Sequence, residues 1–264
     1  APSLIALPTN IEAYARISAL LTLGNLRTEK GSCILYKADV FQHAEGTRFI
    51  LIPPTSLNEV FDFETSFKDA ANDYRIALGD KLSIAATRTY GGNDAKMLAH
   101  IYQLATELKI PMVATNDIHY HHFLRRELQD VVTCVREKCT IHTAGFNLYP
   151  NAERFLKPNE EMLRLFRQYP DAIRNAQSIA EACRFSLDEL KYKYPREVTS
   201  EDRTPQEELV FLTWKGANEI FKHDVPEKVK ATIQYELDFI AQVNYAEYFL
   251  TVYDIVRYAR EQKI

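Results

Sequence analysis

The chain has 264 residues and a formal net charge of −4, with 32 lysine and arginine residues against 36 aspartate and glutamate residues. Hydrophobic residues make up 46% of the chain and charged residues 26%, which is an ordinary soluble globular composition. No apolar stretch is long enough to span a bilayer, so we expect no membrane segment. The absence of a basic excess gives no support for strong nucleic-acid binding by this chain in isolation.

The cysteines and the N-terminus bear on the compartment. The four cysteines form no C-x-x-C pair, and their spacing suits neither a zinc site nor a disulfide scaffold; they are Cys33, Cys134, Cys139 and Cys183. The first residues contain neither the basic region nor the cleavage signature of a secretory signal. Reduced thiols are the simplest interpretation, and we expect a cytoplasmic protein.

The first 120 residues predict an α/β fold. Strands are indicated at residues 4–7, 33–36, 49–52, 82–86 and 110–114, where short apolar runs end near polar or turn residues. Between the last two strands, apolar residues recur at helical spacing: Met97, Leu98, Ile101, Leu104, Ala105 and Leu108. A strand, a helix and a strand at this spacing indicate a βαβ unit with a parallel sheet.

Helical patterns replace the strand signal after residue 120. Two amphipathic helices are predicted, one from Leu124, Leu128, Val131, Val132 and Val135 and one from Ile173, Ala176, Ile179, Ala180 and Cys183. The polar stretch from Lys191 to Arg203 contains Pro195 and is interpreted as a connection. It provides the domain boundary.

The residues after the connection predict three helices. Thr204 and Glu207 form a capping box, with Pro205 at the first helical position, and Pro226 opens a second helix with Val229, Ile233, Leu237 and Ile240 facing inward. The run 248–256 is apolar on more than one side, and such a helix is normally packed between other elements. The sequence ends eight residues later, so we expect a chain that is cut short.

The sharpest local feature is the pair Asp117 and His119, which follows the strand predicted at 110–114. If the strand continues, the two side chains share one side. A carboxylate and an imidazole converging at the end of a barrel strand can bind a divalent metal, although a zinc site needs three or four ligands. The alternative is that Asp117 caps the following turn and His119 is an ordinary surface histidine.

Other candidates are weaker. His121 and His122 extend the histidine run but are interpreted as surface residues, and His142 near Cys139 lacks partner ligands. Gly91 and Gly92 precede a helix, yet two glycines in a turn need no bound phosphate to explain them. No phosphate loop, dinucleotide fingerprint or nucleophile triad can be found.

Several segments resemble the alpha subunits of bacterial DNA polymerase III, the C-family polymerases. Residues 113–120 (VATNDIHY) resemble the late metal motif of their PHP (polymerase and histidinol phosphatase) domain. The resemblance is dense from about residue 80 to the end, and it includes residues 151–157 (NAERFLK), 160–162 (EEM), 169–175 (YPDAIRN), 179–183 (IAEAC), 235–240 (YELDFI) and 248–256 (YFLTVYDIV). The last two resemble the family's entry into the polymerase palm.

The error-prone, damage-tolerant branch is the most similar, at residues 125–130 (RRELQD), 151–154 (NAER) and 183–190 (CRFSLDEL). The chain also departs from the family pattern. The opening H-x-H strand is absent, and Ser3 and Thr55 stand where the resemblance implies a metal histidine and a cysteine. Only Asp117 and His119 are carried over as metal ligands. The resemblance places the catalytic aspartates, which would hold two Mg²⁺ ions, beyond residue 264.

The resemblance implies an incomplete PHP-type (β/α) barrel at residues 1–145, an α-helical connecting region at 146–203 and the helical start of the palm at 204–264. The parent protein is expected to be a DNA-directed DNA polymerase of the lesion-bypass type, with this segment inactive alone. A second hypothesis is a PHP-type metal-dependent phosphoesterase or exonuclease, and a third is a non-catalytic scaffold. The missing ligands favour the scaffold over the exonuclease.

The expected cofactors and partners follow from the same resemblance. Mg²⁺ belongs to the parent polymerase, while Zn²⁺ or Mn²⁺ at the PHP remnant would be weakly held or absent. The expected partners are the DNA template-primer, dNTPs, a sliding clamp and lesion-bypass accessory proteins. We also expect self-association, because missing barrel strands would leave the strand at residues 4–7 with an unpaired side.

Overall fold

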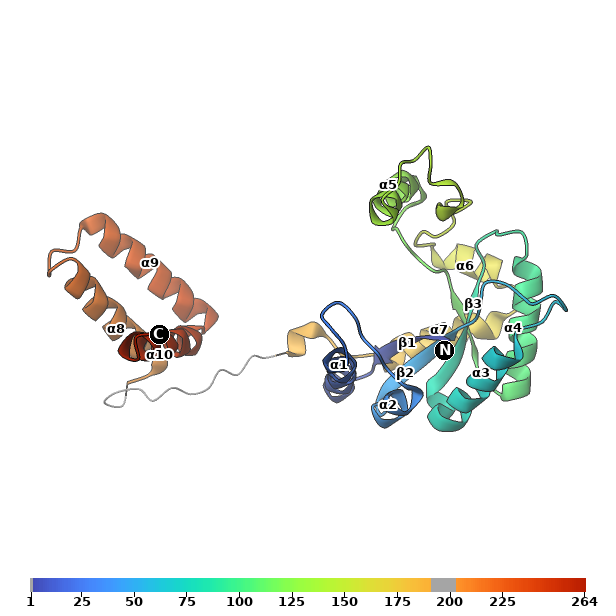
Figure 1. Cartoon of the computed structure of the whole chain (residues 1–264), viewed down its shortest axis with the longest axis horizontal. Helices are drawn as coiled ribbons and strands as arrows, with labels where there is room; N and C mark the ends of the chain where they lie inside the picture. Colours follow the sequence, from blue (N-terminus) through green and yellow to red (C-terminus); the bar gives the residue numbers. More distant parts are fainter. Residues whose placement is uncertain (1, 191–202) are drawn as a thin grey trace. The chain divides into compact units, whose positions relative to one another are not determined.

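The computed structural model describes residues 2–190 and 203–264. Its contacts divide the chain into two compact units, residues 1–190 and 191–264 (Figure 1). Apart from Arg203, the connection predicted from Lys191 to Arg203, including Pro195, lies outside the described residues. None of the described helices is long and apolar enough to cross a lipid bilayer.

The first unit is built on a mixed four-stranded sheet in the order β1-β2-β3-β4. The strands are β1 Ser3–Pro8, β2 Thr47–Ile52, β3 Leu82–Thr87 and β4 Met112–Thr115. β1 is antiparallel to β2, whereas β2, β3 and β4 are parallel to one another. The prediction of an α/β fold is therefore confirmed, with an open sheet in the described residues.

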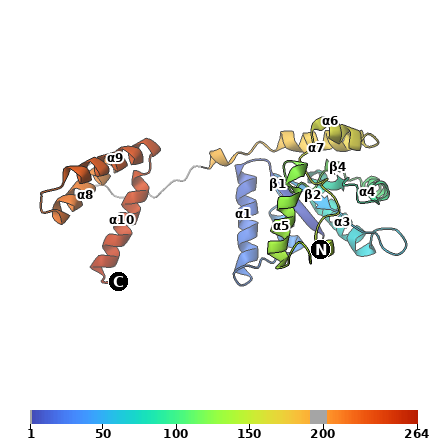
Figure 2. The same cartoon turned by 90° about the horizontal axis from the view of Figure 1, so that it is seen from above.

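Helices cover both faces of this sheet, because its residues are apolar on both sides. Phe49, Leu51 and Ile84 point into a core shared with α3 (Thr65–Leu78) and α4 (Asp94–Leu108). The alternate residues Ile50, Ala85 and Val113 form a second cluster, against which Ala176 and Ile179 of α7 (Pro170–Ala182) pack. Figure 2 shows α3 and α7 on opposite sides of the strands. The predicted inward face of α4 is confirmed. Its buried residues recur at helical spacing and are Met97, Leu98, Ile101, Leu104 and Ala105.

The strand predicted at residues 33–36 is wrong. This segment has no strand structure and lies between α1 (Ile11–Leu26) and α2 (Lys37–Gln42). Its backbone is held instead by the end of α1, where the N–H of Ile34 donates to the carbonyl of Gly24 at 3.2 Å. Gly24 allows this approach, because a Cβ there would lie 2.5 Å from Cys33 Sγ. The run thus contacts the end of α1, pairs with no strand, and leaves Cys33, Ile34 and Tyr36 exposed.

The remaining helices of the first unit include α5 (Arg126–Glu137) and α6 (Asn159–Leu165). Short 3₁₀ turns lie at Gly79–Lys81, Phe123–Arg125, Gly145–Asn147 and Leu187–Glu189. The predicted helix is confirmed as α5 from Arg126 onward, with Leu124 in the 3₁₀ turn before it, but its apolar face is exposed. The buried side of α5 carries Thr133 and Cys134.

The second unit contains α8 (Pro205–Ile220), α9 (Glu227–Val243) and α10 (Ala246–Glu261). The predicted capping box is confirmed: the hydroxyl of Thr204 accepts from the N–H of Glu207, and the Glu207 carboxylate accepts from the N–H of Thr204. The three helices share a small apolar core made of Leu209, Leu237, Ile240, Ala246 and Leu250.

The run 248–256, whose pattern is typical of a helix packed between other elements, is only partly covered within the described residues. Only Ala246 and Leu250 of α10 are buried, whereas Phe249, Val252 and Ile255 are exposed. The reason is geometric, because α8 and α9 cover one side of α10 and an apolar surface that extends around the helix needs cover on more sides.

Candidate functional site

Asp117 and His119 lie in the loop after β4, which ends at Thr115. The strand does not continue as the alternation argument assumed, because Asp117 adopts a left-handed conformation with φ of 43°. The side chains nevertheless meet, since His119 Nε2 lies 3.5 Å from Asp117 Oδ1. The turn, and not strand alternation, brings the two predicted residues together.

Arg154 and Tyr149 complete this arrangement. The Nε of Arg154 lies 3.2 Å from Asp117 Oδ2, an ion-pair distance. The Arg154 guanidinium stacks over the Tyr149 ring at 4.1 Å, and the Tyr149 hydroxyl lies 3.0 Å from His119 Nε2. Asp117, His119, Tyr149 and Arg154 therefore form a closed ring of contacts, which we call the clamp.

Backbone contacts fasten the same two segments to each other. The N–H of His119 donates to the carbonyl of Arg154 at 2.9 Å, and the N–H of Leu156 donates to the carbonyl of Tyr120 at 3.1 Å. Tyr120 and Phe155 form an isolated parallel bridge. Burial raises the pKa of the Tyr120 hydroxyl. The segment 153–156 thus runs alongside the loop that follows β4.

The side chain of Asn116 also holds the segment 153–156 in place. It is buried, and its Nδ2 donates to the carbonyls of Phe155 at 2.6 Å and Glu153 at 3.2 Å. The ammonium of Lys157, whose side chain is almost fully buried, also donates to the Glu153 carbonyl. Backbone carbonyls that would otherwise be unpaired are satisfied by these two side chains.

The remaining sequence candidates lie outside the clamp. His121 and His142 are exposed, and Nδ1 of His122 accepts from the N–H of Leu124 at 3.3 Å, which starts a short helical turn. Burial raises the pKa of the Cys134 thiol, beside Cys139. Gly91 and Gly92 form the turn before α4, in which Gly92 has φ of 91°.

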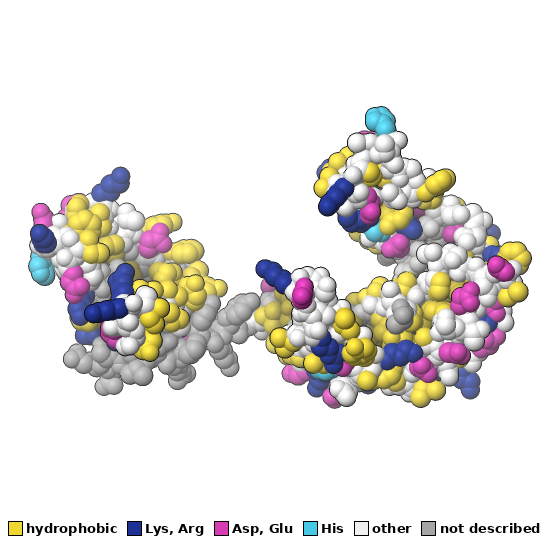
Figure 3. All heavy atoms as spheres, viewed as in Figure 1, with side chains coloured by type: hydrophobic (Ala, Val, Ile, Leu, Met, Phe, Trp, Pro, Cys, Tyr) yellow, Lys and Arg dark blue, Asp and Glu magenta, His cyan; other side chains and the backbone are white. Residues whose placement is uncertain are grey.

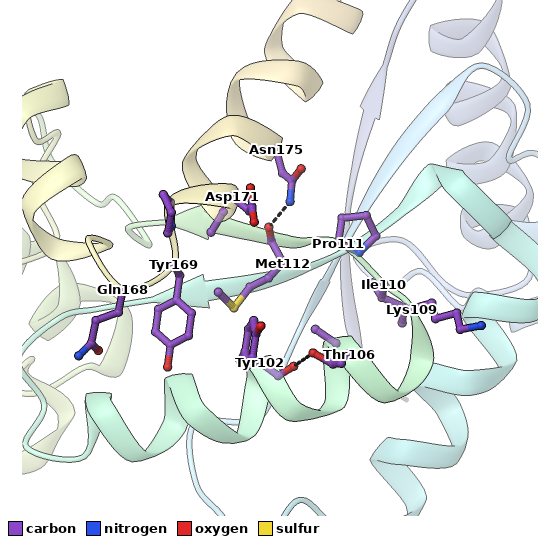
Figure 4. A pocket seen from close by; sticks show the side chains of 13 residues that line it. Tyr102, Thr106, Lys109, Ile110, Pro111, Met112, Gln168, Tyr169, Asp171 and Asn175 are labelled. Atoms are coloured by element: carbon purple, nitrogen blue, oxygen red, sulfur yellow. Dashed lines mark hydrogen bonds between the residues drawn. The ribbon is translucent and has the colours of Figure 1, made fainter.

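A pocket of about 480 Å³ lies at the opposite end of β4, between the end of α4 and the start of α7 (Figure 4). Tyr102, Met112 and Tyr169 line it, and Asn175 Nδ2 donates to the carbonyl of Met112 at 2.8 Å. Its ionisable groups are Lys109, Asp171 and the two tyrosines, with no imidazole or thiol. No sequence pattern indicated this pocket, because its walls come from two separate segments, 102–112 and 168–175.

Comparison with known proteins identifies relatives along the whole chain. The family model of the bacterial DNA polymerase III alpha NTPase domain matches residues 207–264. The Error-prone DNA polymerase of Rhodopseudomonas palustris (strain BisB5) is 45% identical over 264 residues, which cover 100% of this chain and 23% of that protein. All 264 residues of the chain thus align with a segment of this error-prone DNA polymerase.

Further error-prone polymerases give the same alignment. That of Caulobacter vibrioides is 43% identical over 264 residues, covering 100% of this chain and 24% of the relative. Error-prone DNA polymerase 2 of Rhizobium meliloti is 41% identical, covering 99% and 24%. The chain thus spans about a quarter of the length of the curated relatives that it matches.

The residues present fit a tightly held metal poorly. Ser3 lies opposite Ile52, at the end of the sheet where β2 and β4 finish, and Thr55 follows the end of β2, but neither supplies an imidazole or a thiolate. Each oxygen of the Asp117 carboxylate faces a group of the clamp, the His119 ring or the Arg154 guanidinium. Within the described residues, no group of three or more His, Cys, Asp or Glu could hold a metal ion.

Proposed function

We propose that this chain serves as a segment of a longer error-prone DNA polymerase that performs template-directed synthesis past damaged bases. The observation that carries the proposal is 40–45% identity to error-prone polymerases along the entire chain. By the same argument, the longer protein binds the DNA template-primer and dNTPs, uses Mg²⁺, and works with a sliding clamp and lesion-bypass accessory proteins in the cytoplasm.

We assign residues 1–145 to the later part of a PHP-type barrel, 146–203 to a helical connecting region and 204–264 to the helical start of the palm. The parallel strands β2, β3 and β4, with intervening helices, support a barrel-type origin of the first part. The family-model match over residues 207–264 supports the assignment of the last part.

Asp117 and His119 are the remnant of a PHP metal site in this proposal, and they would hold Zn²⁺ or Mn²⁺ weakly at most. The guanidinium of Arg154 already neutralises the Asp117 carboxylate, so a cation would have to displace it. The clamp therefore acts as a scaffold that fastens residues 149–156 to β4. A PHP-type phosphoesterase, the alternative function, would need a polynuclear metal site here.

A segment exchange tests the polymerase proposal. The matching segment of the Rhodopseudomonas palustris enzyme is replaced by residues 1–264, and primer extension is measured on undamaged templates and on templates with an abasic site. We expect extension on both templates, at rates close to those of the unexchanged enzyme. A chimera that has the circular dichroism spectrum of the unexchanged enzyme and yet extends no primer would contradict the proposal.

A further inference from the structure

Two of the four cysteines of the chain lie at the C-terminal end of α5. The helix ends at Glu137, and Lys138 follows it in the left-handed conformation, with φ of 53°. The N–H of Lys138 donates to the carbonyl of Val135 at 3.3 Å. The N–H of Cys139 donates to the carbonyl of Cys134 at 3.0 Å. These two bonds define a Schellman motif, a turn that commonly terminates an α-helix.

The motif brings Cys134 and Cys139 together, because its first and last residues commonly touch through their side chains. The Cα atom of each residue lies at a fixed distance from its own backbone N or O. The hydrogen bond between the two residues therefore keeps their Cα atoms within about 7 Å, the greatest separation that a disulfide bridges without backbone movement. The two thiols also interact directly, which adds to burial in raising the pKa of Cys134.

We propose that Cys134 and Cys139 form a reversible disulfide that closes the end of α5, by exchange with a low-molecular-weight disulfide of the glutathione class. Both residues are free thiols in the structure, which describes the reduced state. Intracellular disulfides are usually transient, so the pair is expected to oxidise when disulfide accumulates and to return to the thiols when it is removed. This inference concerns the 264-residue chain itself and does not depend on its assignment to a polymerase.

Exposure assigns the order of the two exchange steps. Cys139 is half-buried, whereas Cys134 is 6% exposed. The region of α5 projects from the rest of the first unit in the space-filling view, so a small disulfide can reach it from solvent (Figure 3). Cys139 is therefore the residue that attacks the external disulfide, and Cys134 is the residue that resolves the intermediate.

The exchange balances without any further reagent. The Cys139 thiolate attacks one sulfur of oxidised glutathione, the glutathione S–S bond breaks, and one glutathione thiolate leaves. The Cys134 thiolate then attacks Sγ of Cys139, and the second glutathione leaves. The protons lost by the two cysteines are taken up by the two glutathione thiolates. Two cysteine thiols are oxidised, and one glutathione disulfide is reduced to two thiols.

The disulfide should have a local effect that can be measured. Its ring, residues 134–139, encloses Arg136 and Lys138, after which trypsin cleaves. Cleavage of a folded chain at these positions requires the end of the helix to open, and a covalent link across the ring opposes that opening. We expect native trypsin cleavage after Arg136 and Lys138 to slow at least about threefold in the oxidised chain.

Peptide mass spectrometry tests the link itself. The full chain is equilibrated with oxidised and reduced glutathione at several ratios, alkylated, denatured and digested with trypsin. Because cleavage sites lie between the two cysteines, their disulfide joins two separate peptides, residues 127–136 and 139–154. We expect this joined pair to appear as the share of oxidised glutathione rises, and to disappear on addition of dithiothreitol.

Three variants separate the steps. Cys134→Ala should stop at the mixed disulfide between Cys139 and glutathione, and Cys139→Ser should leave Cys134 to be alkylated after denaturation. Cys33→Ser, at an exposed cysteine outside the motif, should leave the joined pair unchanged. In both variants that lack the link, the trypsin cleavage rate should no longer depend on the glutathione ratio.

The wild-type chain alone can overturn the proposal, so the test does not depend on how the variants fold. Alkylation of both Cys134 and Cys139 at the highest share of oxidised glutathione would overturn it. A glutathione adduct on Cys139 as the final product would overturn it too, as would a joined pair that forms only in urea. An oxidised chain that trypsin cleaves at the reduced rate would contradict the closure of the helix end.

Discussion

Replacement of Asn116 by alanine should destabilise the first unit by about 2 kcal/mol, because a buried carbonyl loses its donor. Asn116 is 5% exposed, and its Nδ2 donates to the carbonyls of Phe155 and Glu153. The Glu153 carbonyl keeps the Lys157 ammonium as a donor. The expected loss therefore comes mainly from Phe155, at roughly 1–3 kcal/mol for one unsatisfied buried acceptor.

Urea denaturation measures this loss and contains an internal control. The single tryptophan of the chain, Trp214, belongs to the second unit, so its fluorescence reports unfolding there. Circular dichroism reports both units. Asn116→Ala should move the circular dichroism transition of the first unit to lower urea while the Trp214 transition stays in place. Asn93→Ala, at an exposed position whose side chain makes no cap bond, should change stability by less than about 0.5 kcal/mol.

Asn116→Asp sharpens the test through its pH dependence. A carboxylate at this buried position would face two carbonyl oxygens, so its pKa should rise in the folded state. The folded state then binds the proton more tightly than the unfolded state, and stability should fall as pH rises from about 4 to 7. A first unit whose Asn116→Ala variant unfolds at the wild-type urea concentration would refute the assigned anchor.

Three further experiments have definite expected outcomes. The guanidinium of Arg27 and the N–H of Tyr36 lower the pKa of Asp39 to about 2, so the stability that this carboxylate provides is complete above about pH 4 and is lost as pH falls toward 2; Asp39→Asn should flatten that part of a stability–pH profile. Thr204→Ala removes the cap of α8 and should lower the stability of the second unit by about 1 kcal/mol, seen in the Trp214 transition. The purified 264 residues, given Mg²⁺ and four dNTPs, should extend no primer above a mock preparation.

Sequence patterns correctly predicted the elements that depend on contacts between residues close together in the sequence. The α4 face and the capping box of α8 were recognisable from spacing alone, because helix burial and capping depend on residues three or four apart. The run at 33–36 has the composition of a strand, but strand formation also needs a neighbour with free backbone groups. Here the end of α1 supplies the hydrogen-bond acceptor instead.

The clamp was only half predictable. Asp117 and His119 are two residues apart and were found as a pair, whereas Tyr149 and Arg154 lie 30 or more residues further along the chain. Residues 151–154 belong to a segment that resembles the family, but no spacing rule assigns Arg154 to Asp117. The same holds for Asn116, whose acceptors are 37 and 39 residues away. Such contacts depend on how the chain returns to β4.

The metal content of the purified chain tests most directly the claim that the clamp is a scaffold and no working metal centre. The chain is dialysed against Zn²⁺ or Mn²⁺, freed of unbound ions, and analysed by elemental mass spectrometry beside Asp117→Ala and an exposed control, His142→Ala. We predict far less than one metal ion per chain in all three proteins, and a melting temperature that hardly differs between metal-treated and chelator-treated samples. One tightly held ion per chain, present in His142→Ala and lost in Asp117→Ala, would contradict the account and restore the phosphoesterase hypothesis.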